Sequence, residues 1–319
     1  MKNPIKALIQ KNQQQGEGEI TLGLWATGLT ASTLSHGPLV WMSGIPTLVM
    51  PRSWKSTKAL LKASEAITNS WLSINNQMID TLLPNLTWTI DVPEGLSEEG
   101  QYLITCNHQT WIDTTVYQYL NPGRLPMGRF FTKYELIYIP FVGQAFKFLG
   151  FPMMKRHPRE AIAKNPKLAQ VDAFEAKRSC ERMKDGPYAL LNYIEGTRLN
   201  EQKHKLQKSP YRHLLKPKYT GLALAFNALE GSIDELLDMT IIYPDGIPTY
   251  LDFWRGKVER ISVKIRKIPV PEWVGSAEFT LDEDYKIKFK AWVDELWLEK
   301  DELIETMRQE LGVTGHKIL

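Results

Sequence analysis

Two short polar stretches hold the residues of this 319-residue chain that could do chemistry. In the first, His108 and Asp113 stand five positions apart in Asn-His-Gln-Thr-Trp-Ile-Asp. Five positions turn a helix by about 140° net, so the two side chains can meet only if His108 lies in a turn before the helix that carries Asp113. Asp113 could then accept the Nδ1–H of His108 and leave Nε2 free as a base. The alternative is a histidine that is simply hydrogen-bonded at a strand end.

The second stretch is Glu195-Gly196-Thr197-Arg198, directly after an apolar run of strand length. Gly196 allows the backbone to approach another group closely. Arg198 offers a planar fork suited to phosphate, and Glu195 could order that arginine or accept a hydrogen bond from a hydroxyl. Taken alone, the stretch could equally be a surface turn with an internal ion pair.

Strands and helices are predicted around both stretches. Alternating or continuous apolar runs predict strands at Trp88–Val92, Tyr102–Cys106, Tyr188–Ile194, Met239–Tyr243 and Val258–Ile268. Helical spacing predicts helices at Ser53–Leu83, Thr110–Leu120, Val171–Asp185, Gly221–Leu229 and Leu281–Leu311, with caps at Ser53 and in a Thr280…Glu283 box. Strands that alternate with helices indicate an α/β domain whose active-site loops lie at strand ends.

The segment Ile20–Met50 contains no Asp, Glu, Lys or Arg, although 24% of the chain is charged. His36-Gly37-Pro38 is expected to divide it into two arms, each shorter than the roughly 20 residues of a spanning helix. The basic residues that follow favour the anionic, cytoplasmic side of a membrane; they are Arg52, Lys55, Lys58 and Lys62. We expect a re-entrant or interfacial helical hairpin, with a buried hairpin of a soluble protein as the alternative.

Composition excludes several classes of protein. A 43% hydrophobic chain with a net charge of +3 is neither disordered throughout nor polytopic. Two cysteines are too few for a disulfide scaffold or a cysteine-built zinc site. No P-loop, Gly-x-Gly-x-x-Gly or metal-ligand spacing occurs, so no metal or nucleotide cofactor is expected. The basic stretch from Lys203 to Lys218 could face anionic lipid or a coenzyme A phosphate, or be solvated, and nucleic acid is disfavoured.

The two polar stretches resemble sequence blocks of the glycerolipid acyltransferase family, the PlsC-like or lysophosphatidic acid acyltransferase group. Asn107, His108 and Asp113 match its Asn-His-x4-Asp block. Its third block is Phe-Pro-Glu-Gly-Thr-Arg, of which the last four residues match while Tyr193 and Ile194 replace Phe-Pro. A Gly-x-Ser-x-Gly nucleophile elbow is missing, and Cys106 is expected to be a strand residue.

The other blocks match less completely, and the resemblance covers roughly residues 86–244. The second block usually ends in Phe-Ile-Asp-Arg, of which only Arg156 is kept. Lys133–Leu136 is similar to the family's Lys-x-Glu-Leu stretch, and Ile241–Pro244 to its short apolar fourth block. Lys203-His204-Lys205 is similar to the branch with lysocardiolipin acyltransferases and bacterial YihG-like enzymes.

The resemblance implies roles for individual residues. His108 would take a proton from the acceptor hydroxyl while Asp113 stabilises the imidazolium. Lys133 is a candidate donor to the oxyanion. The candidates for holding the acceptor are two arginines for its phosphate, Arg156 and Arg198, and three residues that shape the glycerol pocket, Glu195, Gly196 and Thr197.

The resemblance also implies a fold and an activity. The expected fold is a mixed β-sheet flanked by helices over residues 85–270, after a membrane-associated hairpin region, 1–84, and before a helical extension, 271–319. The implied reaction moves a fatty acyl group from acyl-CoA or acyl carrier protein to a lysophospholipid, first of all lysophosphatidic acid, giving phosphatidic acid. Another lysophospholipid, glycerol 3-phosphate, or a catalytically silent lipid-binding role are the alternatives. The expected location is the cytoplasmic face of a membrane, in a bacterium the inner one.

Overall fold

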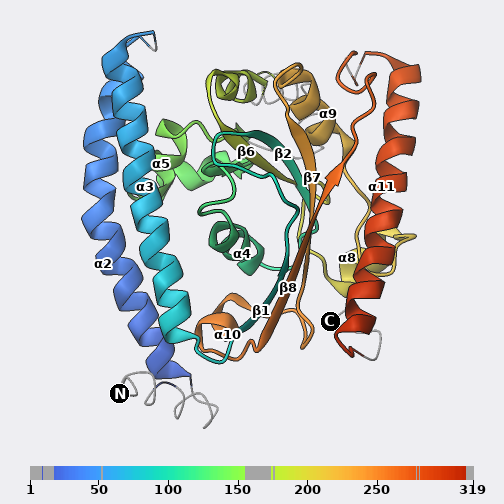
Figure 1. Ribbon diagram of the computed structural model, residues 1–319, viewed down its shortest axis with the longest axis horizontal. Helices are drawn as coiled ribbons and strands as arrows, with labels where there is room; N and C mark the ends of the chain where they lie inside the picture. Colours follow the sequence, from blue (N-terminus) through green and yellow to red (C-terminus); the bar gives the residue numbers. More distant parts are fainter. Residues whose placement is uncertain are drawn as a thin grey trace.

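The computed structural model describes residue 9 and residues 18–51, 53–154, 174, 177–277, 279 and 281–313. Its centre is a six-stranded sheet in the order β1-β8-β7-β2-β6-β3 (Figure 1). Strands β7 and β8 are antiparallel, whereas the other neighbouring pairs are parallel, so the sheet is mixed as expected. The strands are β1 (Thr87–Asp91), β2 (Gln101–Cys106), β3 (Gly128–Phe130), β6 (Tyr188–Tyr193), β7 (Glu235–Ile242) and β8 (Arg260–Ile268).

The central strands bury side chains on both faces of the sheet. In β2, Leu103 belongs to the apolar cluster on one face and Ile104 to the cluster on the other. Successive side chains of a strand point to opposite faces, so a strand covered on both sides needs apolar residues at nearly every position. This explains why the apolar runs predict β2, β6 and β7 to within a few residues.

Helices cover both faces of the sheet (Figure 1). Apolar residues of α3, α4 and α10 join one cluster, and those of α9 and α11 join the other. The bounds of these helices are α3 (Lys55–Leu82), α4 (Ile112–Leu120), α9 (Tyr219–Ala228), α10 (Tyr250–Trp254) and α11 (Glu283–Glu310).

Short elements fill the connections. A second, two-stranded parallel sheet pairs β4 (Thr132–Lys133) with β5 (Met153–Met154). The remaining short helices are η2 (Tyr134–Tyr138), α5 (Val142–Phe148), η3 (Arg182–Asp185) and α8 (Glu201–Gln207). The predicted helix at Val171–Asp185 falls largely outside the described residues. The division into 1–84, 85–270 and 271–319 stays a prediction.

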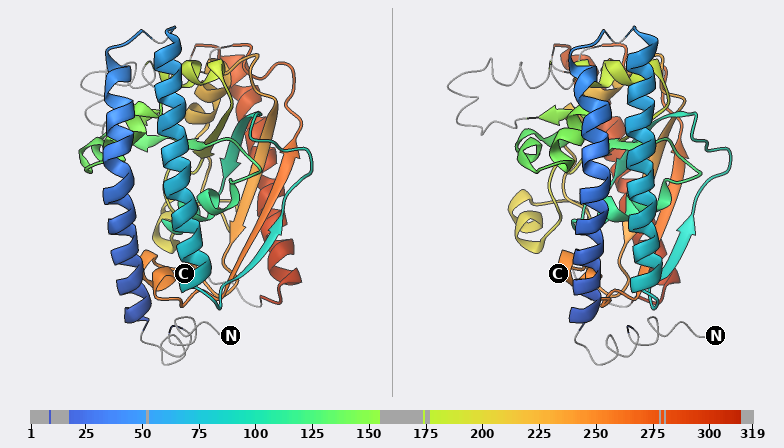
Figure 2. Two further views of the ribbon diagram at one scale, coloured as in Figure 1. Left: turned by 60° about the vertical axis from the view of Figure 1, so that its left-hand side comes forward. Right: turned by 90° about the vertical axis from the view of Figure 1, so that its left-hand side faces the viewer.

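The uncharged segment forms one helix, and the prediction that it divides at Pro38 is wrong. Helix α2 runs unbroken over Glu19–Gly44, with Pro38 inside it. A proline inside a helix removes one backbone hydrogen bond, but its further clash with the Cβ of the preceding residue is missing here, because that residue is Gly37. The turn comes later, at η1 (Ile45–Leu48), after which α3 returns alongside α2 (Figures 1 and 2). The hairpin therefore pairs the uncharged segment with the basic, amphipathic segment that follows it.

Glycines of α2 allow it to pack closely on α5. A Cβ at Gly37 would lie 2.6 Å from the Phe141 ring, and one at Gly44 would overlap Phe148. At the other end of α2, Trp25 stacks on Trp254 of α10 with ring centroids 4.6 Å apart. The hairpin is thus held against the rest of the molecule at both ends of α2.

Two predicted helix caps are not as expected. Helix α3 begins at Lys55, and its N-cap residue, Trp54, makes no side-chain cap, so the cap at Ser53 is wrong. Helix α11 begins after Asp282, whose side chain accepts a hydrogen bond from the Tyr285 amide at 2.9 Å. Thr280 of the predicted capping box lies outside the described residues.

Candidate active site

The two polar stretches meet at one edge of the sheet. Strands β7, β2 and β6 are adjacent and parallel, so their carboxyl ends lie together. His108 follows β2, Glu195 follows β6 and Tyr243 follows β7. In open α/β sheets this edge is where ligands bind. The strand-end position predicted for both stretches is therefore correct.

Asn107 joins two of these strand ends. Its side-chain NH₂ donates to the Ile241 carbonyl at 2.8 Å, and its side-chain oxygen accepts from the Ile241 amide at 2.9 Å. The side chain thus replaces a strand pairing beyond the end of β2 and fixes where the next residue, His108, begins its turn. This gives a physical reason for the asparagine in the Asn-His-x4-Asp block.

His108 and Asp113 form the expected pair. The imidazole Nδ1 lies 2.8 Å from Asp113 Oδ2, with His108 in the turn and Asp113 in the first turn of α4. Asp113 is fully buried, whereas 16% of the His108 side chain is exposed. An ionised carboxylate only accepts hydrogen bonds, so Nδ1 carries the proton and Nε2 keeps its lone pair. The geometry is that of an oriented general base.

Asp113 is surrounded by donors. Its Oδ2 also accepts the backbone amides of Gln109, at 2.6 Å, and Thr110, at 2.9 Å, and its Oδ1 accepts the Tyr243 hydroxyl at 2.7 Å. Four donors on its two oxygens stabilise the ionised carboxylate, which acts only as an acceptor. Tyr243 was named in the sequence only as part of an apolar block, and its spacing gives no sign of this contact.

Tyr193 contacts the other partner of the pair. Its ring stacks on the His108 imidazole with centroids 4.0 Å apart and planes 19° apart. It is the residue that replaces the phenylalanine of the third block, so the aromatic ring is retained. The sequence shows this substitution but not that the ring lies against His108.

Glu195 lies beneath the site and out of reach of solvent. It is fully buried, and the backbone amides of His108 and Leu215 hydrogen-bond its carboxyl group. Burial raises the pKa of Glu195 well above its usual range. Its Oε2 has no hydrogen-bond partner among the described residues. These contacts favour a role in holding the two loops together over the direct contact with an acceptor hydroxyl that the sequence suggested.

The loop after Glu195 packs tightly on its neighbours. Gly196 adopts a φ of 65°, in the left-handed region, and a Cβ there would lie 2.8 Å from the Lys218 side chain. The loop is joined to the His108 turn by the Leu199 amide, which donates to the His108 carbonyl at 2.7 Å. The positive φ and the close approach of Lys218 both favour glycine at position 196.

Cationic side chains surround this loop. The Arg198 guanidinium lies 4.4 Å from the centroid of the exposed Trp111 ring, a cation–π contact that orients it. Lys203 Nζ donates to the Thr197 hydroxyl at 2.7 Å and to the Arg198 carbonyl at 2.9 Å. With Lys218 against Gly196, three cations lie around three loop residues. The arrangement suits an anionic group such as phosphate.

One predicted site residue does not join this group, and a second cannot be placed in it or outside it. Lys133 is exposed at the end of β4, and among the described contacts none joins it to His108 or to the 196–198 loop. Arg156 lies outside the described residues.

Cys106 is a buried strand residue, and burial raises the pKa of its thiol well above the usual range, which disfavours a thiolate nucleophile. Within the described part of the chain, no three potential ligands cluster to hold a metal ion.

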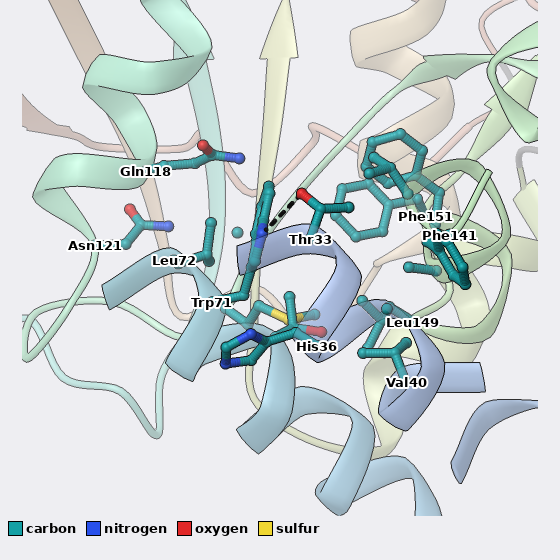
Figure 3. A pocket seen from close by; sticks show the side chains of 17 residues that line it. Thr33, His36, Val40, Trp71, Leu72, Gln118, Asn121, Phe141, Leu149 and Phe151 are labelled. Atoms are coloured by element: carbon teal, nitrogen blue, oxygen red, sulfur yellow. Dashed lines mark hydrogen bonds between the residues drawn. The ribbon is translucent and has the colours of Figure 1, made fainter. Parts of the chain in front are cut away.

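An apolar hollow lies between the hairpin and the sheet domain (Figure 3). About 80 Å³ of it is wide enough to hold water-sized molecules, and the rest of the space is narrow or open to solvent. His36 and Val40 of α2, Trp71 of α3, Asn121 after α4 and Phe141 before α5 are among its walls. The Trp71 indole is fixed by donating to the Thr33 hydroxyl at 3.3 Å. Because segments far apart in the chain form the hollow, sequence patterns could not reveal it.

Comparison with known proteins identifies the family. Residues 88–244 match the family model described as Acyltransferase. The human "1-acyl-sn-glycerol-3-phosphate acyltransferase gamma" is 26% identical over 199 residues, covering 59% of this chain and 48% of that protein. The Saccharomyces cerevisiae "2-acyl-1-lysophosphatidylinositol acyltransferase" is 26% identical over 246 residues, covering 63% and 59%. These matches support membership of the PlsC-like glycerolipid acyltransferase family, through the Acyltransferase domain at residues 88–244.

A solved structure supports the fold. The crystal structure of "the 1-acyl-sn-glycerophosphate (LPA) acyltransferase, PlsC, from Thermotoga maritima" aligns with a TM-score of 0.51 and 15% sequence identity. The alignment covers 90% of this chain and 95% of that one. The chain spans about half the length of the first curated relatives it matches. Phospholipid metabolism is thus supported as the general setting, and the substrates are a separate question.

Proposed function

We propose that this enzyme transfers a fatty acyl group from acyl-CoA or acyl carrier protein to the free hydroxyl of lysophosphatidic acid, giving phosphatidic acid. The observation that carries the proposal is the His108–Asp113 pair, in which Nδ1 is engaged and Nε2 is left to act as a base. His108 Nε2 takes the hydroxyl proton as the oxygen attacks the thioester carbonyl. The tetrahedral intermediate then collapses, the C–S bond breaks, and the imidazolium returns the proton to the leaving thiolate.

The acyl chain is assigned to the apolar hollow. Helix α4 links the two sites, because Asp113 lies in its first turn and Gln118, which lines the hollow, follows five residues later, about 8 Å along the axis. Apolar side chains from α2, α3 and α5 supply the other walls. Burial of each methylene group there contributes about 0.8 kcal/mol. The hollow therefore offers the transferred fatty chain an apolar place away from water.

The phosphate of the acceptor is assigned to the loop at 196–198. Arg198, Lys203 and Lys218 place three positive charges there. A phosphate monoester carries about −1.5 to −2 charges near neutral pH, by analogy with phosphorylated side chains. Three positive charges match a phosphate monoester, such as that of lysophosphatidic acid, better than the single negative charge of a phosphate diester in other lysophospholipids.

The hairpin is assigned to the membrane surface. Its most exposed apolar residues lie near the turn between α2 and α3, where Met42 is 74% and Val49 87% exposed. Lys55, Lys58 and Lys62 follow on the exposed surface of α3 and suit anionic headgroups. No described helix is both long and apolar enough to cross a bilayer. We propose shallow insertion of this turn on the cytoplasmic face, which liposome flotation with Val49→Asp would test through lost binding.

An acyl-transfer assay tests the function. Long-chain acyl-CoA and acyl carrier protein donors are offered with lysophosphatidic acid, lysophosphatidylinositol, lysophosphatidylcholine and glycerol 3-phosphate. We expect phosphatidic acid as the main product and a loss of roughly 10³-fold in kcat for His108→Ala. Transfer to glycerol 3-phosphate alone would move the proposal to that acceptor. Lipid binding without turnover, unchanged in His108→Ala, would favour a silent lipid-binding protein.

A further inference from the structure

Two tyrosines contact the His108–Asp113 pair, and neither was assigned a role in the sequence analysis. We propose that Tyr243 and Tyr193 are positioning residues for the His108 base, Tyr243 acting through Asp113 and Tyr193 through the plane of the imidazole. The inference deepens the proposed function and rests on it for the role of His108 as a base. It concerns residues that touch His108 or Asp113 and need not touch the substrate.

Tyr243 completes the set of hydrogen bonds to the Asp113 carboxylate. Oδ2 is already shared by His108, Gln109 and Thr110, so the hydroxyl of Tyr243 is the described donor to Oδ1. Asp113 is fully buried, and Tyr243 is 3% exposed, so water cannot replace the hydroxyl without rearrangement. Burial and the nearby Asp113 charge raise the pKa of Tyr243 well above its usual range. The hydroxyl therefore keeps its proton and remains a donor at any pH at which the enzyme works.

This hydrogen bond affects how strongly His108 binds a proton. A carboxylate with one donor fewer is less well stabilised, so it interacts more strongly with a positive imidazolium. Loss of the Tyr243 hydroxyl should therefore favour the protonated form of His108. Because the protonated form cannot act as a base, the active fraction would fall on the acid side of the working range.

Tyr193 fixes the plane of the imidazole. The hydrogen bond from Nδ1 restrains one atom of the ring but leaves it able to tilt about that bond. The Tyr193 ring lies parallel to it, 4.0 Å away between centroids, and closes one face. The Tyr193 hydroxyl approaches Thr114 Oγ1 at 3.4 Å, a weak contact beside the stack. The ring should therefore matter more than the hydroxyl.

Other charged or titratable groups face the same site. Glu195 approaches from the loop after β6 and Cys106 from β2, while Arg198 lies over Trp111. Lys300 lies behind them on α11, near both Glu195 and Cys106. None of these four donates a hydrogen bond to Asp113 among the described contacts. The effect of removing the Tyr243 hydroxyl can thus be assigned to Oδ1.

The test measures the protonation of His108 directly by NMR on full-length protein with labelled histidine. The chain has six histidines, and His108→Ala identifies the signal of interest. We expect Tyr243→Phe to raise the titration midpoint of that signal by about one pH unit, because a hydrogen bond to a charged group is lost. Tyr193→Phe, the matched removal of a neighbouring phenol hydroxyl, should leave the midpoint in place. Tyr193→Leu should lower kcat about tenfold, which Tyr193→Phe should not.

Incorporation of 3-fluorotyrosine at position 243 provides a second test that keeps the side chain intact. Fluorine makes the hydroxyl a stronger donor, so the midpoint should move down instead of up. A midpoint that stays in place in both Tyr243 variants would overturn the role of Tyr243, even if the melting temperature falls. Equal turnover in Tyr193→Leu and wild type would overturn the role of Tyr193. If wild-type protein transfers no acyl group, the proposed function fails, while a shifted midpoint still supports the contact.

Discussion

Replacing Ala145 by leucine should shorten the acyl chain that the enzyme prefers. Ala145 lies on α5 and lines the apolar hollow, opposite the hairpin. Leucine adds three carbon atoms, which occupy about the space of three methylene groups. Each methylene excluded from the hollow forfeits about 0.8 kcal/mol, so about 2.4 kcal/mol of binding is lost for the longest chains only. That difference corresponds to roughly 50-fold in relative kcat/KM.

The assay is a competition between long-chain and medium-chain acyl-CoA donors in one reaction, with product chains separated by mass spectrometry. The ratio of products gives the ratio of kcat/KM values without the need for absolute rates. The 50-fold figure is an upper limit, because neighbouring rings can shift to accommodate part of the new side chain. Medium-chain transfer serves as an internal measure of folded, active enzyme.

A matched substitution separates filling of the hollow from other effects of the larger side chain. Ala66 lies on α3 with its side chain exposed, so Ala66→Leu makes the same chemical change outside the hollow. It should leave the product ratio unchanged. An unchanged ratio in Ala145→Leu, with medium-chain activity intact, would show that the hollow does not hold the acyl chain. A shift in both variants would refute the reasoning equally.

Three further substitutions probe the site. Arg198→Ala should raise the KM for lysophosphatidic acid about tenfold with little change for the thioester, and an effect confined to the thioester would reassign the residue. Asn107→Leu leaves the Ile241 amide and carbonyl unpaired and should lower the free energy of unfolding by about 4 kcal/mol in urea titrations. The pKa of Glu195 is raised in the folded protein. The stability that its protonated form contributes is therefore complete below about pH 4.3, the unfolded value, and is lost as pH rises toward the folded value. The advantage of Glu195→Gln in unfolding free energy should therefore grow from pH 4 to pH 8, and a constant difference would contradict the burial argument.

The sequence predicts the strands well because each central strand is covered on both faces. Tyr102–Cys106 and Tyr188–Ile194 are apolar runs of strand length, and both are strands within one residue of the predicted ends. The order of strands could not be predicted from the sequence, since β1 pairs with β8 across more than half of the chain. Which strands pair depends on the packing of the whole sheet, and local sequence patterns do not show it.

The error at Pro38 has a local cause. Proline and glycine together usually end a helix, yet Gly37 removes the clash that a Cβ would make with the proline ring. The same glycine allows α2 to approach Phe141 closely. Gly37 has the sequence pattern of a helix breaker but serves to pack α2 against α5. Only the position of α5 distinguishes these two interpretations.

The candidate site was predictable where neighbouring residues supply the chemistry. His108 and Asp113 are five residues apart and meet as predicted. Tyr193 ends β6 and Tyr243 directly follows β7, 85 and 135 positions after His108, so their contacts depend on strand order. The replacement of phenylalanine by Tyr193 was the one visible sign that an aromatic ring is needed there.

The hairpin and the His108 turn are mechanically connected, which bears on the proposal that the enzyme works at a membrane surface. Trp25 of α2 stacks on Trp254, and α10 begins two residues after Pro248. The Pro248 carbonyl accepts the Thr110 hydroxyl at 2.7 Å, and the Thr110 amide donates to Asp113. A short series of contacts therefore fixes the depth of His108 relative to α2. If the turn of the hairpin sets the depth of the enzyme in the bilayer, these contacts set the height at which the acceptor hydroxyl meets the base.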